Sequence, residues 1–501
     1  MKKKSLLFIL LISCIILSIS SVVASDLNDT ATSAIEEEAD VISISNANET
    51  LIESSNNDLI AASADDGTFT ALQNKINNAS KGDTITLDKD YTYDEGFSTK
   101  GIVIKKDLTI NGNGHTLNGQ SKSRIFNILY GLPENNKVTL NNIKFVNGNT
   151  DLYGGAIFNY GDLTVNNCVF TNNHAKYCGG AINSVGNLKA NKCTFNKNTA
   201  GGDAGAVFTL TIDKAVMYYA NYYKNTTPQG DMEFIFALTI QPSLKFGTDY
   251  IKNCVFNNNV AKGRGGGAVY AFSHVNINSC TFNSNKASEN GGAVFGNKDL
   301  FIKNSKFNYN TAKKFGGAVY FRCHELSGHY VGDKWVQDIK YYSNLIESST
   351  FKKNAAKNGG AIFGFKYSEK DKKHGAKAVK CKFDENKAKK GRDMYGGTTS
   401  KCVFLYYKLT LKKVAIKKSA KKLVLKATLK KGNKAVKGKK ITFKFRGKYY
   451  NAKTNKKGIA KVTIKKYVLN SLKVGKKVMY KATYKASYGK VIAKKTAKVK
   501  E

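Results

Sequence analysis

Hydrophobic and polar positions alternate over short stretches through most of this chain, and the same arrangement of positions returns many times. In GGAIFNYGDLTVNNCVFTNNHAKYCGGAI, residues 154–182, the opening four letters come back after 25 residues. Short alternating stretches bounded by Gly and Asn are typical of β-strands joined by tight turns. Self-similarity at a fixed period is typical of a solenoid, in which each repeat forms one coil.

Two interleaved motifs define the repeat, a Phe with an Asn three residues later and a Gly-Gly-Ala segment. The first motif gives the pairs Phe170 and Asn173, Phe195 and Asn198, Phe256 and Asn259, Phe282 and Asn285, Phe307 and Asn310, Phe351 and Asn354, and Phe383 and Asn386. The second motif begins at the glycine pairs Gly154 and Gly155, Gly179 and Gly180, Gly266 and Gly267, Gly291 and Gly292, Gly316 and Gly317, and Gly359 and Gly360.

Stacking of coils explains why these residue types recur. Three short strands with turns make one coil of about 20–25 residues, and parallel strands of successive coils lie about 4.8 Å apart. Identical positions then lie above one another, so Phe forms an interior stack. Asn tolerates a left-handed turn and passes hydrogen bonds between coils through its amide. Gly-Gly provides a bend where no Cβ fits. The sequence therefore predicts an all-β fold built on a parallel β-helix.

An amphipathic helix is predicted ahead of the repeats. Phe69, Leu72, Ile76 and Ala79 share one helical face, with Thr68 as the expected N-cap and Gly82 as the expected end. Strands are expected at residues 84–87 and within 108–119. A helix in this place covers the open end of a solenoid.

The last hundred residues follow a different pattern. Ile441, Phe443 and Phe445 alternate with Thr442 and Lys444, and turn signals recur about every 10–20 residues. This pattern predicts a small β-sandwich.

The repeats resemble those of chlamydial polymorphic outer-membrane proteins and of the adhesin-like proteins of methanogenic archaea. The resemblance covers about residues 66–402, and it implies a right-handed parallel β-helix of the pectate-lyase-like class that acts in surface adhesion. The chlamydial proteins end in a membrane β-barrel, which is not expected here, so the archaeal proteins are the nearer likeness. The stretch GKYYNAKTNKKGIAKVTI resembles immunoglobulin-like modules of surface adhesins, which serve as spacers or wall-proximal stalks.

Four segments are expected from these patterns. Residues 1–25 combine three lysines, an apolar run and the small residues Ala24 and Ser25, as in a secretory signal peptide. Residues 26–65 form an acidic flexible linker, 66–402 the capped right-handed β-helix, and 403–501 a basic immunoglobulin-like β-sandwich. No membrane span is expected after removal of the signal, so the protein is expected to be secreted or on the cell surface.

Charge is concentrated at the C-terminal end. Residues 401–501 hold 33 lysines and Arg446 against one acid, Glu501, out of a net charge of +43 for the chain. Such polarity often indicates nucleic acid, but export and the absence of a base-reading motif make that partner unexpected. Anionic wall polymers or acidic glycans are the expected partners of this segment. A merely solvated surface is the alternative.

Three coils carry insertions directly after the Gly-Gly-Ala segment, at residues 209–249, 321–347 and 364–377. A shared attachment point predicts that the insertions lie on one side of the β-helix, where the first two are able to meet. Their aromatic and polar residues suit sugar rings, since variable loops on a rigid scaffold often carry binding. The candidate ligand-binding residues are Tyr222, Tyr223, Asp231, His324, His329, Trp335, Tyr341 and Tyr342. The alternative is that these aromatic residues form small cores within the loops.

Five cysteines, two positions before a repeat Phe, share one register. They are Cys168, Cys193, Cys254, Cys280 and Cys381, and Ser305 and Ser349 take the same place in other coils. A position that accepts Cys or Ser predicts a small inward slot with buried thiols. Disulfides between coils are the alternative. No structural zinc site is expected, since no CxxC motif is present, and no other metal and no cofactor are expected.

These patterns favour a non-enzymatic surface adhesin. In this hypothesis the β-helix loops bind extracellular polysaccharide, or glycans or proteins on a partner cell, and the basic segment associates with an anionic cell wall. One alternative is a polysaccharide lyase or glycoside hydrolase on the same fold. Its support is limited to Asn149-Thr150-Asp151, one fragment of a polygalacturonase motif. A purely structural stalk is the second alternative.

Overall fold

The computed structural model describes residues 66–129, 135–211, 246–331, 334–366 and 375–501. The signal peptide expected at 1–25 and the acidic linker expected at 26–65 lie outside the described residues. In the described part no helix is long and apolar enough to cross a membrane.

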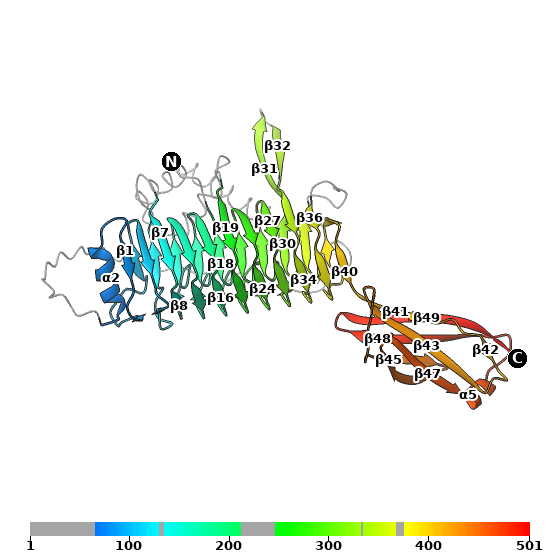
Figure 1. Cartoon of the computed structure of the whole chain (residues 1–501). Coiled ribbons are helices and arrows are strands. Elements are labelled where there is room, and N and C mark those ends of the chain that lie inside the picture. The colour runs from blue at the N-terminus through cyan, green and yellow to red at the C-terminus, as the bar shows by residue number, and fades with distance from the viewer. Residues whose placement is uncertain (1–65, 130–134, 212–245, 332–333, 367–374) are drawn as a thin grey trace, which may run out of the picture. The chain divides into compact units, whose positions relative to one another are not determined.

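Helix α2 (Phe69–Asn78) covers the first coil (Figure 1). Phe69, Leu72 and Ile76 are buried, and the Thr68 hydroxyl accepts a hydrogen bond from the Ala71 N–H at 3.1 Å. Gln73 pairs with the backbone at the edge of strand β3 (Ile102–Ile104). Its side chain accepts a hydrogen bond from Val103 N at 2.7 Å and donates one to Val103 O at 3.0 Å. The helix ends at Asn78, before the expected Gly82, since the backbone is already extended at Ala79.

The described strands of the repeats stack into four parallel sheets, numbered here in the order in which each coil visits them. Sheet 1 contains β1 (Thr84–Thr86), β4 (Leu108–Asn111), β7 (Lys137–Asn141), β11 (Asp162–Asn166), β15 (Leu188–Asn191), β19 (Thr248–Lys252), β23 (His274–Asn278), β27 (Leu300–Lys303), β33 (Asn344–Glu347), β36 (Ala376–Val379) and β39 (Gly397–Ser400). Sheet 2 contains β2 (Tyr91–Thr92), β5 (Thr116–Asn118), β8 (Lys144–Val146), β12 (Val169–Thr171), β16 (Thr194–Asn196), β20 (Val255–Asn257), β24 (Thr281–Asn283), β28 (Lys306–Asn308), β34 (Thr350–Lys352), β37 (Lys382–Asp384) and β40 (Val403–Leu405).

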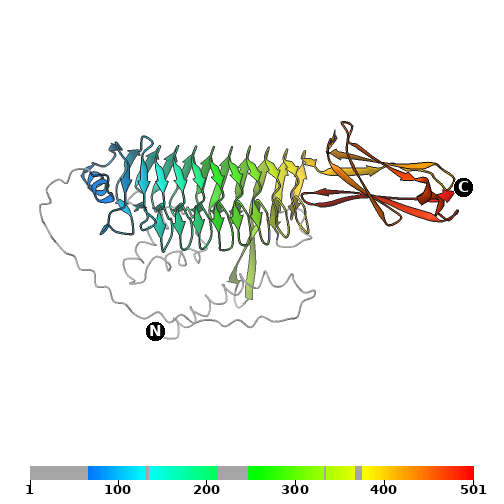
Figure 2. The same ribbon diagram turned by 90° about the horizontal axis from the view of Figure 1, so that it is seen from below.

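Two further sheets complete the coils. Sheet 3 contains the short strands β9 (Asn149–Thr150), β13 (His174–Ala175), β17 (Thr199–Ala200), β21 (Val260–Ala261), β25 (Lys286–Ala287) and β29 (Thr311–Ala312). Sheet 4 contains β3 (Ile102–Ile104), β6 (Phe126–Ile128), β10 (Ile157–Asn159), β14 (Ile182–Ser184), β18 (Val207–Thr209), β22 (Val269–Ala271), β26 (Val294–Gly296), β30 (Val319–Arg322), β35 (Ile362–Phe365) and β38 (Met394–Tyr395). The stacked sheets confirm a β-helix (Figure 2). Its central coils have a fourth short strand that the sequence did not predict, and its hand stays a prediction.

The β-helix continues to Leu405, a few residues past the expected boundary at 402. Strand β40 pairs in parallel with β37, and Phe404 stacks on Phe383 with ring centroids 5.3 Å apart. The motif of a Phe with an Asn three residues later does not recur after Asn386, so the sequence does not mark the end of the last strand.

The interior holds a continuous aromatic stack. Successive ring centroids lie 4.7–4.8 Å apart from Phe145 to Phe351, and Phe383 extends the stack at 5.2 Å. The spacing equals the distance between hydrogen-bonded strands. Side chains at one register position of neighbouring coils are therefore in direct contact, as the repeat predicts.

The repeated Asn forms a buried hydrogen-bonded ladder beside the Phe stack. The Asn259 Oδ1 accepts from both Asn198 N and Asn198 Nδ2 at 3.0 Å. The Asn259 Nδ2 in turn donates to Phe195 O at 3.0 Å and to Asn285 Oδ1 at 2.9 Å. Each buried amide thus satisfies backbone groups of neighbouring coils, which the strand ladders leave unpaired at the corner.

The ladder asparagines do not themselves use the left-handed conformation that Asn tolerates. Positive φ occurs one position earlier, at Asn172 (57°), Lys197 (54°) and Asn258 (56°). Ser284, Tyr309 and Lys353 hold the same place in later coils. Varied residues accept this strain, so the Asn is required for its amide and not for its backbone.

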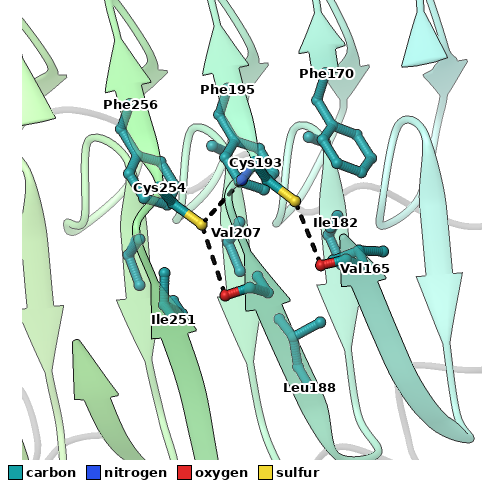
Figure 3. Packing of buried hydrophobic residues seen from close by; sticks show 14 of the residues in the cluster. Val165, Phe170, Ile182, Leu188, Cys193, Phe195, Val207, Ile251, Cys254 and Phe256 are labelled. Atoms are coloured by element: carbon teal, nitrogen blue, oxygen red, sulfur yellow. Dashed lines mark hydrogen bonds between the residues drawn. The ribbon is translucent and has the colours of Figure 1, made fainter. Parts of the chain in front are cut away.

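The cysteine register forms an interior column next to the Phe stack (Figure 3). The Cys193 Sγ donates to Val165 O at 3.5 Å, and the Cys254 Sγ accepts from Cys193 N at 3.4 Å. Ser305 has the same role, because its Oγ donates to Lys303 O at 2.8 Å and accepts from Cys280 N at 3.1 Å. The eight cysteines within the described ranges are free thiols, and Cys402 extends the column beyond Cys381.

Residues 407–501 form two sheets with a separate core. Sheet 5 contains β41 (Tyr407–Leu411), β43 (Lys422–Lys431), β44 (Lys434–Ala435) and β47 (Ile459–Lys465). Sheet 6 contains β42 (Ile416–Lys417), β45 (Lys440–Phe445), β46 (Lys448–Lys453), β48 (Lys477–Ala486) and β49 (Gly489–Lys500), and helix α5 spans Lys466–Asn470. Ile441, Phe443 and Phe445 are fully buried, as the alternation predicts. The immunoglobulin-like type of this two-sheet segment stays a prediction.

Replacing Asn259 tests the ladder. We expect Asn259→Ala to lower the free energy of unfolding by about 2–4 kcal/mol, because two donors of Asn198 and the Phe195 carbonyl lose their partner inside the coil. The control is Asn257→Ala. Asn257 belongs to a parallel but half-exposed ladder, where its Nδ2 donates to Asn196 Oδ1 at 2.9 Å, and water replaces that bond. Urea unfolding compares the two variants, and equal losses would contradict the assigned role of the buried amide.

Replacing Cys254 tests the interior slot. We expect Cys254→Ser to change the free energy of unfolding by less than about 1 kcal/mol, since Ser305 already fills the same slot. Cys254→Val is the control, and it should cost more because Cys193 N loses its acceptor. Burial raises the pKa of the Cys254 thiol and raises that of Cys381 to about 12. Both should therefore resist a thiol reagent until the protein unfolds, and rapid labelling of the folded protein would exclude a closed column.

Candidate functional site

The insertions leave the β-helix at one corner. Each follows a strand of sheet 4, namely β18, β30 or β35, and the chain returns to sheet 1 at β19, β33 or β36. Strands β22 and β26 separate β18 from β30, so the first two insertions leave three coils apart. The shared attachment expected from the sequence is therefore present.

The second insertion forms a projecting antiparallel hairpin of β31 (His324–Val331) and β32 (Lys334–Tyr341), seen above β30 in Figure 1. Of the residues in β32, only Ile339 is half-buried, and the others are exposed. An isolated two-stranded hairpin is marginally stable in water. Contacts at its base therefore decide how firmly it is held.

The indole of Trp335 packs against Gly328 of β31, and 59% of the surface of Trp335 is exposed. A Cβ on Gly328 would lie 2.4 Å from Trp335 Cζ2, so only glycine leaves room for the indole at this place. The indole is thereby packed against β31 while more than half of its surface stays exposed. Tyr341, near the base, is 38% exposed.

A buried ionic cluster holds the base of the hairpin. The Lys298 ammonium, on a side chain that is 5% exposed, donates to Glu325 Oε2 at 2.5 Å and to the Tyr342 hydroxyl at 2.7 Å. The Tyr342 hydroxyl also donates to Glu325. Lys298 belongs to the preceding coil, between β26 and β27. The cluster therefore joins Glu325 in β31 and Tyr342, directly after β32, to the β-helix.

The same lysine joins the two large insertions. Its Nζ lies 4.5 Å from the ring centroid of Phe246, at the return of the first insertion, and 5.1 Å from that of Tyr342, at the return of the second. A cation between two aromatic rings is favourable, and more so away from water. The described ends of the two insertions therefore both contact Lys298, and whether the insertions meet over one surface stays a prediction.

Burial and charge oppose each other within this cluster. Burial lowers the pKa of Lys298, against the attraction of Glu325. Burial raises the pKa of Glu325, but the Lys298 ammonium, the Tyr342 hydroxyl and the charge of Arg322 together outweigh it, and the net shift is downward. Burial, together with the hydrogen bond to Glu325, raises the pKa of Tyr342. The attraction between Lys298 and Glu325 thus favours the charged forms of both, and the raised pKa of Tyr342 favours its neutral phenol.

A second buried carboxylate holds the return of the first insertion. Asp249 is fully buried, and it accepts from Leu188 N at 2.9 Å, Thr211 Oγ1 at 2.6 Å and Ser273 Oγ at 2.6 Å. Burial raises its pKa to about 6. Thr211 precedes and Asp249 follows the undescribed part of the insertion. The network therefore joins both ends of that segment to each other and to the coils on either side.

The predicted ligand-binding residues are only partly brought together. Tyr222, Tyr223 and Asp231 lie outside the described residues, and His329 lies in β31 opposite Val336. Trp335 and Tyr341 are exposed on the hairpin. His324 and Tyr342 differ from the expectation of solvent-facing side chains, because 2% and 6% of their surfaces are exposed. His324 stacks on Phe365 at 5.3 Å, and Tyr342 packs in the Lys298 cluster.

Lys298, Glu325 and Asp249 are the residues that the sequence reasoning missed. The strand register places Lys298 in the column that Gly161 and Gly186 occupy in earlier coils, and Asp249 in the column of Leu163 and Leu188. A charged residue in a column of glycine or leucine is a signal that alignment of the coils makes visible. Among the described residues no group of three or more His, Cys, Asp or Glu is arranged to hold a metal ion.

Some of the repeats match a known family of protein repeats. Four segments match the family model of the Chlamydia polymorphic membrane protein repeat, at residues 167–185, 253–271, 279–297 and 348–364. The matched segments contain the Cys, Phe, Asn and Gly-Gly positions that stack in the coils. They indicate a surface-exposed, adhesin-like β-helical protein. No curated protein and no solved structure matches the chain.

Replacing Lys298 tests the base of the hairpin. We expect Lys298→Met to destabilise the hairpin by about 1–2 kcal/mol, less than for a fully buried pair because the Glu325 side chain is 37% exposed. Trp335 is the only tryptophan of the chain, so its emission during urea unfolding reports the hairpin. The difference from wild type should shrink as pH falls through the lowered pKa of Glu325, since a protonated Glu325 no longer attracts Lys298.

The matched control is Lys303→Met on the adjacent strand. Lys303 lies 3.4 Å from Glu347 with 57% of its side chain exposed, and such surface pairs contribute little. Equal effects of the two variants on Trp335 emission would show that the buried cluster does not hold the hairpin.

Proposed function

We propose that this protein is a surface adhesin that binds carbohydrate through the β31–β32 hairpin and associates with anionic wall polymers through its basic C-terminal segment. The observation that carries the proposal is the exposed indole of Trp335, packed against Gly328. A flat ring with one apolar face matches the C–H face of a sugar ring, and aromatic residues supply contact area at low entropic cost.

The hairpin has the support that a binding element needs. Its base is tied to the β-helix by Lys298, Glu325 and Tyr342, and Asp299 Oδ1 accepts from Ser343 N at 2.6 Å just past β32. A preformed element loses less conformational entropy on binding than a loop that must be ordered. The repeats indicate a surface-exposed protein, which is where an extended glycan or a partner-cell glycan is met.

The basic segment supports the second part of the proposal. Between residues 403 and 500 the sequence contains no Asp or Glu, so a strong positive potential surrounds this part of the chain. Such a potential attracts polyanions, and the attraction is screened by salt.

A polysaccharide lyase or hydrolase is the alternative. Lys298 and Tyr342 are residue types that serve as base and acid in elimination. They are 5% and 6% exposed and hydrogen-bonded to Glu325. A polymer has little access to groups placed in this way, which favours a positioning role at the hairpin base.

Replacing Trp335 tests the carbohydrate site. We expect Trp335→Ala to weaken binding to the preferred polysaccharide, among neutral and acidic polymers and isolated cell walls, by about tenfold or more. The control is Tyr309→Ala, since Tyr309 is 48% exposed on a coil corner between sheets 2 and 3, away from the insertions. Titration of wild-type Trp335 emission with the polymer reports occupancy directly.

Two outcomes would overturn the proposal. Binding that survives Trp335→Ala unchanged places the carbohydrate elsewhere. Release of unsaturated or reducing sugar ends by wild type, lost on Lys298→Met, identifies an enzyme.

A further inference from the structure

The outward face of sheet 6 carries lysines directly opposite one another. Lys444 on β45 is in register with Lys481 on β48, and Lys481 is in register with Lys494 on β49. The flanking residues Tyr480 and Ala482 point inward and are fully buried. Cβ atoms of directly opposite residues lie about 4.5–5.5 Å apart, so three ammonium-bearing side chains form one row across three strands.

This arrangement is unfavourable for the isolated protein. Like charges directly opposite each other destabilise a sheet, and Lys485 opposite Lys490 and Lys477 opposite Lys498 repeat the arrangement on the same strands. Since the sequence from 403 to 500 contains no acidic residue, the charge that balances the row has to come from outside this segment. A polyanion provides it and releases condensed counterions on binding.

An aromatic ring stands at the end of the row. Tyr449 on β46 is in register with Lys444, is 64% exposed, and has the Lys444 Nζ 5.1 Å from its ring centroid. Tyr467 on α5 is also 64% exposed, with the Lys448 Nζ 5.4 Å from its ring. The row thus runs from a stacking surface to three cations, which suits a polymer that has both sugar rings and acidic groups.

Sheet 5 provides an internal comparison. Lys426 on β43 is in register with Lys461 on β47, and Lys412 N donates to Lys426 O at 2.8 Å beside them. This is also a row of three lysines. None of the exposed large hydrophobic residues of the described chain lies on β41, β43 or β47, so this row lacks an exposed ring.

We propose that the outward face of sheet 6 binds a linear acidic polysaccharide, with a sugar ring on Tyr449 and anionic groups along Lys444, Lys481 and Lys494. Neighbouring strands lie about 4.8 Å apart. Successive lysines therefore meet successive acidic sugar units of a polysaccharide that lies across the strands. The inference rests on the proposed association of the basic segment with anionic wall polymers, and it assigns that association to one face. Single-stranded nucleic acid is less well suited, because it uses successive stacking platforms, not a single ring beside a cation row.

The test compares two triple variants of the full chain that lose the same charge. These are Lys444→Gln/Lys481→Gln/Lys494→Gln on sheet 6 and Lys412→Gln/Lys426→Gln/Lys461→Gln on sheet 5. Polygalacturonate is the probe at low salt, with polyphosphate and single-stranded DNA as competitors. We expect the sheet 6 variant to bind about tenfold more weakly and the sheet 5 variant to change less than about threefold, since only the former loses contacts with the bound polymer. Tyr449→Ala should weaken binding of polygalacturonate and leave that of polyphosphate unchanged.

The outcomes separate this inference from the proposed wall association. Equal losses in both triple variants, with all binding released at about 0.5 M salt, would leave a charge-based association intact and overturn the assigned face. Failure of wild type to bind polygalacturonate, while it binds isolated walls, would overturn the polymer class. Tighter binding of single-stranded DNA than of polygalacturonate would also overturn the proposed polymer class. Both variants should unfold at equal or higher urea than wild type because repulsion is removed, and this checks that lost binding is not lost folding.

Discussion

The buried amide ladder holds each coil at one step from the next, and the other features of the β-helix depend on that step. Asn198 and Asn259 share hydrogen bonds across an insertion of several dozen residues as closely as Asn173 and Asn198 do across a simple coil. Every Nδ2 in the ladder points the same way, and the last, on Asn386, donates to Asp393 Oδ1 at 2.9 Å. Aligned amides that end on a carboxylate strengthen one another in a low dielectric. Because the register is constant, the corner between sheets 4 and 1 carries the insertions at a whole number of coils from one another.

Where the chain re-enters sheet 1 after the first or second insertion, a polar residue replaces the usual interior leucine. Asp249 and Asn344 occupy the interior column that Leu163, Leu188 and Leu300 fill elsewhere, and each accepts a hydrogen bond from a backbone N–H of the preceding coil. An apolar side chain at these points would pack, but it would not satisfy a strand edge whose partner arrives after a long excursion. Burial of the Asp249 carboxylate raises its pKa to about 6, although its hydrogen bonds oppose the shift. The first two insertions are therefore built into the coil by polar groups, whereas the third returns with the buried Ala376 in the same column.

The sequence predicted the part of this protein that repeats and missed much of what does not. Period and residue type sufficed for the Phe stack, the Asn ladder, the Cys or Ser slot and helix α2, because each is repeated or follows a simple periodicity. They did not yield the short strands of sheet 3, since two-residue strands leave no periodic trace. Lys298 and Glu325 are far apart in sequence, and only the register brings them together. The aromatic residues of the second insertion were visible in the sequence, but whether each faces solvent, as Trp335 does, or the coil, as Tyr342 does, depends on hairpin pairing.

Paired strands place side chains of one register position side by side. The β-helix and the C-terminal two-sheet segment fill such exposed positions with different residue types. On sheet 2 the outward column runs through Asn196, Asn257, Asn283 and Asn308, whose neutral amides hydrogen-bond to one another at 2.9 Å. The chain thus has a working solution for an exposed in-register column. Sheet 6 does not use it and places lysine against lysine, which a merely soluble surface does not require. Repulsion that is retained where a neutral alternative exists elsewhere in the same chain argues that the charge itself is what the C-terminal segment presents to its partner.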